Sequence, residues 1–293
     1  MRYWIALLVV SALYLATPAR ADWPTMDEQI EQTNVILGDG SDPFCSGVII
    51  SKKHRLIATA EHCITDIFKT NPEKRVNPAT GEVTDILIET QEDFVNIWQN
   101  KYLNHDVVGQ NHFFARVLIR DAKIDTAVLQ VVDPEWQPKG EAPFAPLDWK
   151  LKRGQTVYAV GNPAGVLDAS ITMGIVSNTQ RKLKIGADKV NYFQIDAAII
   201  GGNSGGAVYD EFGRLIGVVS AGMKQSTINF AVPISGLRDL LRVAGFPEFG
   251  GQFRASATNN PSVPRAYPYR KGGLLESIER LVSGDEAIVF KDR

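Results

Sequence analysis

A short glycine-rich string around one serine constrains this chain more than any other feature. Residues Gly201-Gly202-Asn203-Ser204-Gly205-Gly206 place Ser204 in a Gly-x-Ser-x-Gly pattern. This pattern can form the nucleophile turn of an α/β-hydrolase, but that fold needs its catalytic histidine after the serine. All four histidines of the chain precede Ser204. The α/β-hydrolase fold is therefore excluded.

Two upstream residues supply the groups that a nucleophilic serine needs. His62 lies in Thr59-Ala60-Glu61-His62-Cys63, and Asp125 lies between His62 and Ser204. A serine hydroxyl is a weak nucleophile at neutral pH, so it needs a base to accept its proton and a carboxylate to orient that base. The subtilisin order would instead place an aspartate before the histidine in an α/β context, which we do not find. His62, Asp125 and Ser204 are therefore the candidate catalytic triad.

Two other aspartates, Asp106 and Asp121, lie near Asp125 in the chain. Asp125 is preferred because the apolar residues alternate over 127–131, which predicts that Asp125 lies at the start of a strand. The other histidines after the motif, His105 and His112, are interpreted as loop residues.

Backbone groups of the glycine-rich string complete the candidate site. The N–H groups of Gly202 and Ser204 are expected to form an oxyanion hole, which stabilises the charge on an attacked carbonyl oxygen. Glycines allow the tight turn that aims such donors. This mechanism needs no cofactor. We also expect no metal site, because no second pair of cysteines or histidines has the spacing of metal ligands.

Composition indicates an ordinary globular protein. The chain has 293 residues, of which 44% are hydrophobic and 22% are charged, and its net charge is −2. This length allows one large or two small domains. The balanced charge gives no indication of binding to nucleic acid or to an anionic membrane surface.

The first 21 residues are predicted to be a cleaved signal peptide. Arg2 is followed by an apolar run over 5–16, and Ala19-Arg20-Ala21 then offers small residues at a cleavage site. An uncleaved anchor is the alternative, but this run is too short to cross about 30 Å of hydrocarbon. We expect an exported protein, periplasmic or secreted, with no stable membrane insertion after cleavage.

Cys45 and Cys63 are the only cysteines. In an oxidising compartment they can form a disulfide, and its loop would stabilise the fold by roughly 3 kcal/mol. Two unpaired buried thiols are the alternative.

Short apolar stretches separated by turns predict an antiparallel β protein, as a barrel or a sandwich. The expected strands cover residues 46–51, 56–60, 86–88, 113–119, 127–132, 156–160, 170–176, 192–195, 206–209, 215–219 and 228–232. Helical spacing follows over 234–244. Residues 247–273 have the composition of a linker, and 274–282 predict a short amphipathic helix that docks on the body or mediates self-association.

With these blocks in place, the chain resembles trypsin-like serine proteases, and most closely their bacterial branch and the HtrA/Deg group. The resemblance runs from about residue 46 to 234. Two motifs lie in the first half: Ser46-Gly47-Val48-Ile49-Ile50 followed by Ala58-Thr59-Ala60-Glu61-His62-Cys63, and Asp125-Thr126-Ala127-Val128-Leu129. Two lie in the second half: Val160-Gly161-Asn162-Pro163 with Thr172-Met173-Gly174-Ile175-Val176-Ser177, and the stretch from Ile195 through Ser204 to Gly206. The resemblance implies two six-stranded Greek-key barrels with the active site in the cleft between them. It also implies the Cys45–Cys63 bridge beside the histidine.

The chain departs from this family pattern in three places. Asn203, before the serine, and the segment Thr33–Gly38 lack the features of zymogen activation by a new amino terminus. HtrA proteases usually carry PDZ domains, and the 48 residues after Gly245 are too few for one. The interval between His62 and Asp125 holds an extra stretch near 71–111, to which we assign no role.

The resemblance places the substrate pocket in five residues: Ala198, Ser220, Ala221, Gly222 and Ile228. Ala198 stands at the pocket base, where an aspartate would select Arg or Lys. Because alanine is neutral, we expect a small or medium aliphatic residue before the cleaved bond. The backbone over 220–222 could pair with an extended substrate.

These observations predict a signal peptide (1–21), a first barrel with His62 and Asp125 (22–138), a second barrel with Ser204 (139–246), and a linker with a short C-terminal helix (247–293). The leading hypothesis is an exported serine endopeptidase acting on proteins or peptides. The alternatives are a non-catalytic or autoinhibited binding protein with this fold, and an esterase that uses the same triad.

Overall fold

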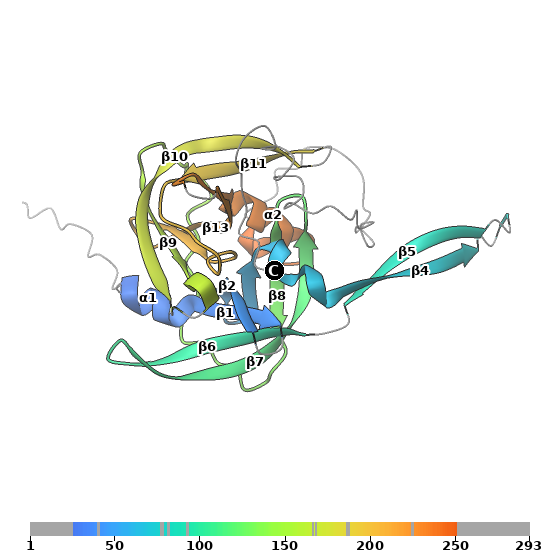
Figure 1. The fold of residues 1–293 in the computed structure, drawn as a ribbon, viewed down its shortest axis with the longest axis horizontal. Helices are drawn as coiled ribbons and strands as arrows, with labels where there is room; N and C mark the ends of the chain where they lie inside the picture. Colours follow the sequence, from blue (N-terminus) through green and yellow to red (C-terminus); the bar gives the residue numbers. More distant parts are fainter. Residues whose placement is uncertain are drawn as a thin grey trace, which may run out of the picture.

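Two closed β-barrels make up the body of the protein in a computed structural model (Figure 1). The structure describes residues 26–39, 42–76, 79–80, 83–91, 94–165, 167, 169–185, 188–223 and 226–250. The predicted signal peptide and C-terminal helix lie outside these residues. The predicted fold class, two six-stranded antiparallel barrels, is confirmed.

The first barrel closes in the order β1-β2-β3-β8-β7-β6. Its strands are β1 (Asn34–Asp39), β2 (Asp42–Ser51), β3 (Leu56–Thr59), β6 (Val95–Leu103), β7 (Asp106–Asp121) and β8 (Thr126–Val131). The pairing of β1 with β6 closes it, with Ile36 opposite Trp98. A 3₁₀ segment, η1 (Glu61–Ile67), follows β3 directly.

The second barrel closes in the order β10-β11-β14-β13-β12-β9. Its strands are β9 (Thr156–Gly161), β10 (Ser170–Ile185), β11 (Asp188–Ile195), β12 (Ala207–Asp210), β13 (Leu215–Gly222) and β14 (Asn229–Pro233). A short turn, η2 (Pro163–Gly165), follows β9, and η3 (Pro247–Phe249) lies near the end of the described chain.

Apolar side chains at alternate positions along the strands point inward and fill each barrel. One cluster fills the first barrel and includes Leu37, Ile57 and Leu129. Another fills the second barrel and includes Phe193 and Ile216. A third cluster joins outward-facing residues of both barrels to a helix near the C-terminal end: Val48, Leu56, Val128, Val160, Tyr209, Val218, Leu237 and Leu241. The two barrels therefore share a buried apolar interface.

Helices at both ends of the described chain reinforce this interface. α1 (Met26–Thr33) precedes the first barrel but bonds to the second, because Gln29 Nε2 donates to Gly213 O at 2.6 Å. Thr33 Oγ1 lies 2.9 Å from the Tyr209 hydroxyl. α2 (Ile234–Val243) follows the second barrel, and its Leu237 and Leu241 pack in the shared cluster with residues of both barrels. Each end of the described chain thus ties the barrels together.

A long hairpin projects from the body between η1 and β6 (Figure 1). It consists of β4 (Phe68–Val76) and β5 (Val83–Gln91), which form a separate two-stranded sheet. We call this hairpin the arm. The expectation of one extra stretch over 71–111 is only partly right, because β6 is a strand of the first barrel. The arm and the outer part of the β6–β7 hairpin are what extend beyond the barrel.

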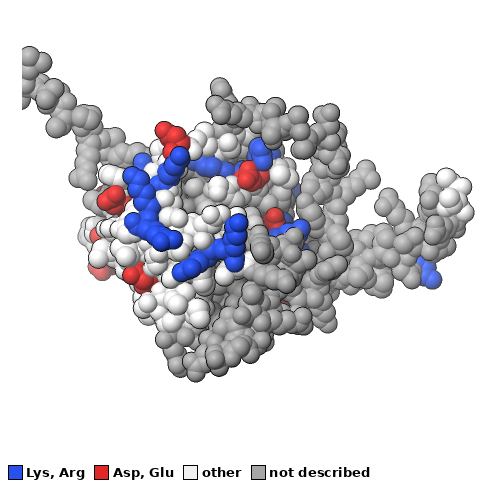
Figure 2. Space-filling model, turned by 90° about the horizontal axis from the view of Figure 1, so that it is seen from above, with Lys and Arg blue, Asp and Glu red and all other residues white. Residues whose placement is uncertain are grey.

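Figure 2 shows Lys and Arg side chains gathered on the face that lies uppermost in Figure 1, among mostly uncharged residues. The chain as a whole is nevertheless close to neutral, with a net charge of −2. Among the described residues, no helix has the length and apolar character needed to cross a membrane.

All expected strands in the described residues overlap observed ones, and the helix predicted over 234–244 is α2. Among the described helices and strands, α1, β1, β4, β6 and the three 3₁₀ segments were not expected. The proposed boundary at 138/139 falls in the connector between β8 and β9, and it stays a prediction.

Candidate active site

η1 carries His62 at the end of the first barrel's β3 strand. The hydroxyl of Thr65 donates to the His62 carbonyl at 3.1 Å, which closes the turn around the histidine. The His62 backbone N–H donates to Asp125 Oδ1 at 2.9 Å. Both ends of the His62 residue, backbone and ring, therefore face the same carboxylate.

Asp125 is fully buried, with 0% of its surface exposed, in the turn between β7 and β8. Its two carboxylate oxygens lie 3.0 and 2.9 Å from His62 Nδ1. Because a carboxylate only accepts hydrogen bonds, Nδ1 carries the proton and Nε2 is left as an acceptor. Ser220 Oγ also donates to Asp125, at 2.6 Å. The carboxylate thus fixes the tautomer and the orientation of the ring.

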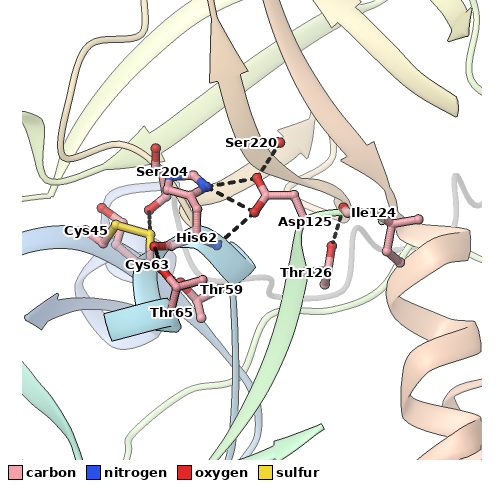
Figure 3. A network of polar contacts seen from close by, with 11 residues as sticks. Cys45, Thr59, His62, Cys63, Thr65, Ile124, Asp125, Thr126, Ser204 and Ser220 are labelled. Atoms are coloured by element: carbon pink, nitrogen blue, oxygen red, sulfur yellow. Dashed lines mark hydrogen bonds and ion pairs between the residues drawn. A yellow bond between two sulfur atoms is a disulfide. The ribbon is translucent and has the colours of Figure 1, made fainter. Parts of the chain in front are cut away.

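Ser204 comes from the second barrel, in the turn between β11 and β12. Figure 3 shows it beside the His62 ring, on the side away from Asp125. Its carbonyl accepts a hydrogen bond from the Ser46 N–H of β2 at 2.8 Å. Gly205 has a φ of +82°, and a Cβ there would meet Thr59 Oγ1 at 2.1 Å. Only glycine allows this close approach of the two barrels.

The peptides that precede Gly202 and Ser204 both have hydrogen-bonded carbonyl groups. The Gly201 carbonyl accepts from Ala164 N–H at 2.6 Å, and the Asn203 carbonyl accepts from Gly206 N–H at 3.0 Å. In a trans peptide the C=O and N–H point in opposite directions, so the N–H groups of Gly202 and Ser204 point away from the donors Ala164 and Gly206. Within the described residues, neither N–H donates a hydrogen bond. Both donors are available to a ligand.

A buried polar network supports this turn from behind. Ser46 Oγ donates to the Gly202 carbonyl at 2.6 Å and accepts from the Asn162 backbone N–H at 2.8 Å. The Asn162 amide in turn donates to the Val35 carbonyl at 3.1 Å and accepts from Asn34 Nδ2 at 2.8 Å. β1 and β2 of the first barrel thus hold the glycine-rich turn of the second.

Cys45 and Cys63 form a disulfide between β2 and η1, with their Cα atoms 6.0 Å apart. The alternative of two unpaired thiols is therefore wrong for this structure. Donor atoms of His62 and the two cysteines lie within 4.8 Å of one another, but both sulfurs are bonded to each other and are not free to hold a metal. The disulfide anchors the residue that follows His62.

The five expected pocket residues lie on neighbouring segments. Ala198 is exposed, whereas Ala221 and Gly222 are buried in β13. Asn229 Nδ2 donates to the Ala197 carbonyl at 2.7 Å and so fixes the segment that carries Ala198. Ile228 is half-buried next to this contact. The Ser220 side chain contacts Asp125, so only its backbone is left for a substrate.

Three residues beside the triad were not found from the sequence. Glu61 is buried against Arg120, with which it forms an ion pair. Burial raises the pKa of Glu61 to about 7, although the positive charge of Arg120 opposes this rise. The signal that could have found Glu61 is a charge that directly follows an apolar strand.

The third residue is Tyr192. Its hydroxyl is buried near Ser220, but the geometry falls outside that of a hydrogen bond. Burial, and then the negative charge of Asp125, raise the pKa of Tyr192 well above its usual value. No local sequence pattern distinguishes this tyrosine from an ordinary core residue.

Comparison with known proteins shows the family of the chain. A family model described as "Trypsin-like peptidase domain" matches residues 45–218. This chain belongs to that family. The matched segment includes His62, Asp125 and Ser204.

Three relatives named "Serine protease HtrA-like" are similar to it. The protein of Staphylococcus haemolyticus is 33% identical over 192 residues, which are 59% of this chain and 29% of the relative. A Staphylococcus epidermidis protein is 26% identical over 259 residues, which are 80% of this chain and 43% of that relative. A Staphylococcus aureus protein is 34% identical over 150 residues, which are 47% of this chain and 18% of that relative. The chain thus spans less than half the length of these relatives.

Among solved structures, the MamO protease domain from Magnetospirillum magneticum in its apo form is similar in fold. Its TM-score is 0.53 at 18% identity, and the match covers 72% of this chain and 96% of that domain. At this identity the likeness concerns the fold alone.

Proposed function

We propose that this protein is an exported serine endopeptidase that forms an acyl-enzyme on Ser204. The arrangement around His62 carries the proposal. Its Nδ1 lies 2.9 Å from Asp125 Oδ2, and Ser204 lies on the other side of the ring (Figure 3). Family membership and the serine protease names of the relatives support the same conclusion.

In the proposed reaction, Ser204 Oγ attacks the carbonyl carbon of a peptide bond while His62 Nε2 accepts its proton. The tetrahedral intermediate then expels the amine, to which His62 returns the proton. A water molecule attacks the acyl-enzyme by the same steps and releases the acid. Asp125 stabilises the imidazolium in each half of the cycle, and it is already held for this by Ser220.

The oxyanion would bind to the N–H groups of Gly202 and Ser204. Both peptides are held from behind by hydrogen bonds to their carbonyl groups, so the donors are oriented before substrate arrives. Such preorganised donors stabilise the transition state more than the substrate. Loss of one donor typically costs about 10²–10³ in rate. No cofactor takes part in these steps.

The proposed preference is for a small or medium aliphatic residue before the cleaved bond. Ala198 brings no charge to the expected pocket base. Asp196, the nearest carboxylate in sequence, accepts a hydrogen bond from the Ile175 N–H at 2.6 Å, so its charge is engaged with β10. Apolar pockets discriminate by only about 1–3 kcal/mol per methylene, and we therefore expect a broad preference.

Export is proposed from the signal-like segment 1–21 together with the Cys45–Cys63 disulfide. Disulfides persist in oxidising compartments such as the periplasm or the extracellular space. Family membership and the disulfide agree with either place.

Labelling with a fluorophosphonate tests the nucleophile. The probe is applied to residues 22–293, to Ser204→Ala and to Ser226→Ala, which removes an exposed loop hydroxyl as a matched control. We expect the parent and Ser226→Ala to be labelled and Ser204→Ala to stay unlabelled. A folded parent that reacts no faster than Ser204→Ala would mean that the site is inactive, as in a binding protein with this fold.

Turnover of a denatured protein and of a short ester then separates the two hydrolase classes. An endopeptidase cleaves internal bonds of the protein, and its product ends identify the preferred residue. Ester cleavage without protein cleavage would support an esterase instead.

A further inference from the structure

Arg120 of β7 contacts both ends of the segment that carries His62. Its guanidinium forms an ion pair with Glu61, the first residue of η1. Its Cζ also lies 4.1 Å from the ring centroid of Phe68, the residue that caps the C-terminal end of η1. The Arg120 and Glu61 side chains are only 15% and 5% exposed. One side chain thus spans the segment from end to end.

η1 has little stability of its own. It is a 3₁₀ segment of seven residues, and its N-cap residue, Ala60, makes no side-chain capping hydrogen bond. Longer 3₁₀ runs have poor hydrogen-bond geometry, and a helix start without a side-chain cap is less stable. Tertiary contacts must therefore keep η1 in place.

We propose that Arg120 is a positioning residue for His62, and that it holds the imidazole against Asp125 by clamping η1 between Glu61 and Phe68. The inference extends the proposed function, in which His62 is the general base. The clamp differs from the contacts already described, because Asp125 and the disulfide hold His62 and Cys63 within η1, whereas Arg120 contacts the two ends of the segment.

Burial and three nearby charged groups act on Glu61 within the clamp. Glu61 lies close enough to Asp125 for the two negative charges to interact, and close enough to His62 to feel its positive form. A buried carboxylate without a counter-charge is costly and becomes protonated. Arg120 supplies this counter-charge, and its contact with the Phe68 ring limits the freedom of its guanidinium.

The clamp also connects His62 to the arm. Phe68 is both the end of η1 and the first residue of β4, so the root of the arm and the histidine segment share the Arg120 contact. The outer arm pairs only with itself among the described strands. Its tip is therefore a part that can be removed without touching the clamp.

The test compares Arg120→Ala with Arg116→Ala. Arg116 lies on the same strand but is exposed and bonds to Gln130 at 2.8 Å, so it is a matched control. For Arg120→Ala we expect kcat on a small ester or peptide to fall roughly 10- to 100-fold with KM little changed, because small displacements of a catalytic group cost rate rather than binding. Arg116→Ala keeps the parent kcat.

A spectroscopic readout decides the proposal independently of turnover. The proton on His62 Nδ1, hydrogen-bonded to Asp125, gives a low-field ¹H NMR resonance that His62→Ala identifies by its loss. We expect this resonance to vanish or broaden in Arg120→Ala and to persist in Arg116→Ala. If the parent shows the resonance but hydrolyses nothing, the proposed function fails while this result still tests the clamp.

Arg120→Lys covers the case in which Arg120→Ala does not fold. Lysine keeps the charge opposite Glu61 but loses the planar face on Phe68, so we expect kcat between those of the parent and Arg120→Ala and a broadened resonance. Folded Arg120→Ala or Arg120→Lys with parent kcat and an unchanged resonance would overturn the proposal.

Discussion

At the scale of single residues, Asp125 combines a costly backbone conformation with a large set of contacts. Its φ is +49°, a left-handed value that non-glycine residues seldom adopt. Such a conformation costs of order 1 kcal/mol or more and persists only where surrounding contacts determine it. Here those contacts are the His62 backbone, the His62 ring and Ser220. The strained residue is one that orients other groups.

Removal of the Ser220 hydroxyl tests how much this orientation matters. Ser220→Ala deletes a hydrogen bond to a buried carboxylate, and bonds to charged groups contribute about 1.5–3 kcal/mol. We expect kcat/KM to fall about tenfold or more, measured on a peptide substrate beside Ser226→Ala. A folded Ser220→Ala with unchanged kcat/KM would show that Asp125 needs no third contact.

Glu61 makes the stability of the fold depend on pH. Its pKa is about 7 in the folded protein against an ordinary value of 4.5, so the folded state binds its proton more tightly than the unfolded state. This contribution to stability is fully present below pH 4.5 and is lost as the pH rises through 7. Glu61→Gln does not titrate and should lose less stability between about pH 5 and pH 8 than the parent.

Urea unfolding of both proteins at these two pH values measures the difference. Parallel stability curves for the parent and Glu61→Gln would contradict a raised pKa at Glu61.

Sequence patterns could indicate His62, Asp125 and Ser204, because a short motif surrounds each of them. They could not indicate Ser220 as the partner of Asp125, because 95 residues separate the two and the contact exists only after both barrels close. The contact between Arg120 and Glu61 could not be predicted from the sequence for the same reason. A charged residue in β7 has no local feature that points to a partner 59 residues earlier.

At the scale of elements, prediction succeeded where apolar residues alternate and failed where tertiary contacts decide. β8 has a plain apolar run and was expected. α1 is mostly polar, and it is stabilised by a bond from Gln29 to Gly213 of the other barrel. β6 was assigned to an extra stretch because the interval between His62 and Asp125 is long. Only the first part of β6, over 95–97, is buried, and the rest extends outward with β7.

The arm should be dispensable for folding. Its strands pair only with each other among the described sheets, and a two-stranded hairpin adds little stability by itself. We expect replacement of residues 71–88 by an Asn-Gly turn, which keeps the pair Thr70 and Glu89, to shift Tm by about 2 °C or less. Loss of a cooperative thermal transition would mean that the arm belongs to the folding core.

At the scale of the whole molecule, the barrels meet through an apolar cluster and through the polar network of Asn162. The two-barrel arrangement was predicted from the family resemblance, whereas the network was not, because its members come from β1, β2 and the turn after β9. Asn162 is fully buried, and its side-chain amide donates to Ser46 Oγ at 3.0 Å, which in turn donates to the Gly202 carbonyl. This network links the first barrel to the glycine-rich turn, beside the hydrogen bond from the Ser46 N–H to the Ser204 carbonyl.

Asn162→Ala tests this link. It leaves several buried groups without partners, each typically worth about 1–3 kcal/mol, so we expect stability to fall by about 2–4 kcal/mol in urea unfolding. Fluorophosphonate labelling of the folded variant should also slow. Asn191→Ala, which removes an exposed asparagine that bonds to Gln180, is the control and should change neither. An equal response of the two variants would refute a special role for Asn162.

The division of the site between the barrels has a consequence for the newly made protein. A ribosome releases the half with His62 and Asp125 first, and that half holds the proposed base without the proposed nucleophile. Ser204 and the Ser220 contact to Asp125 arrive only when the second barrel emerges and packs against the first. Proteolytic activity would then appear only when the second barrel has folded against the first. An incomplete chain would therefore be harmless to the cell that makes it.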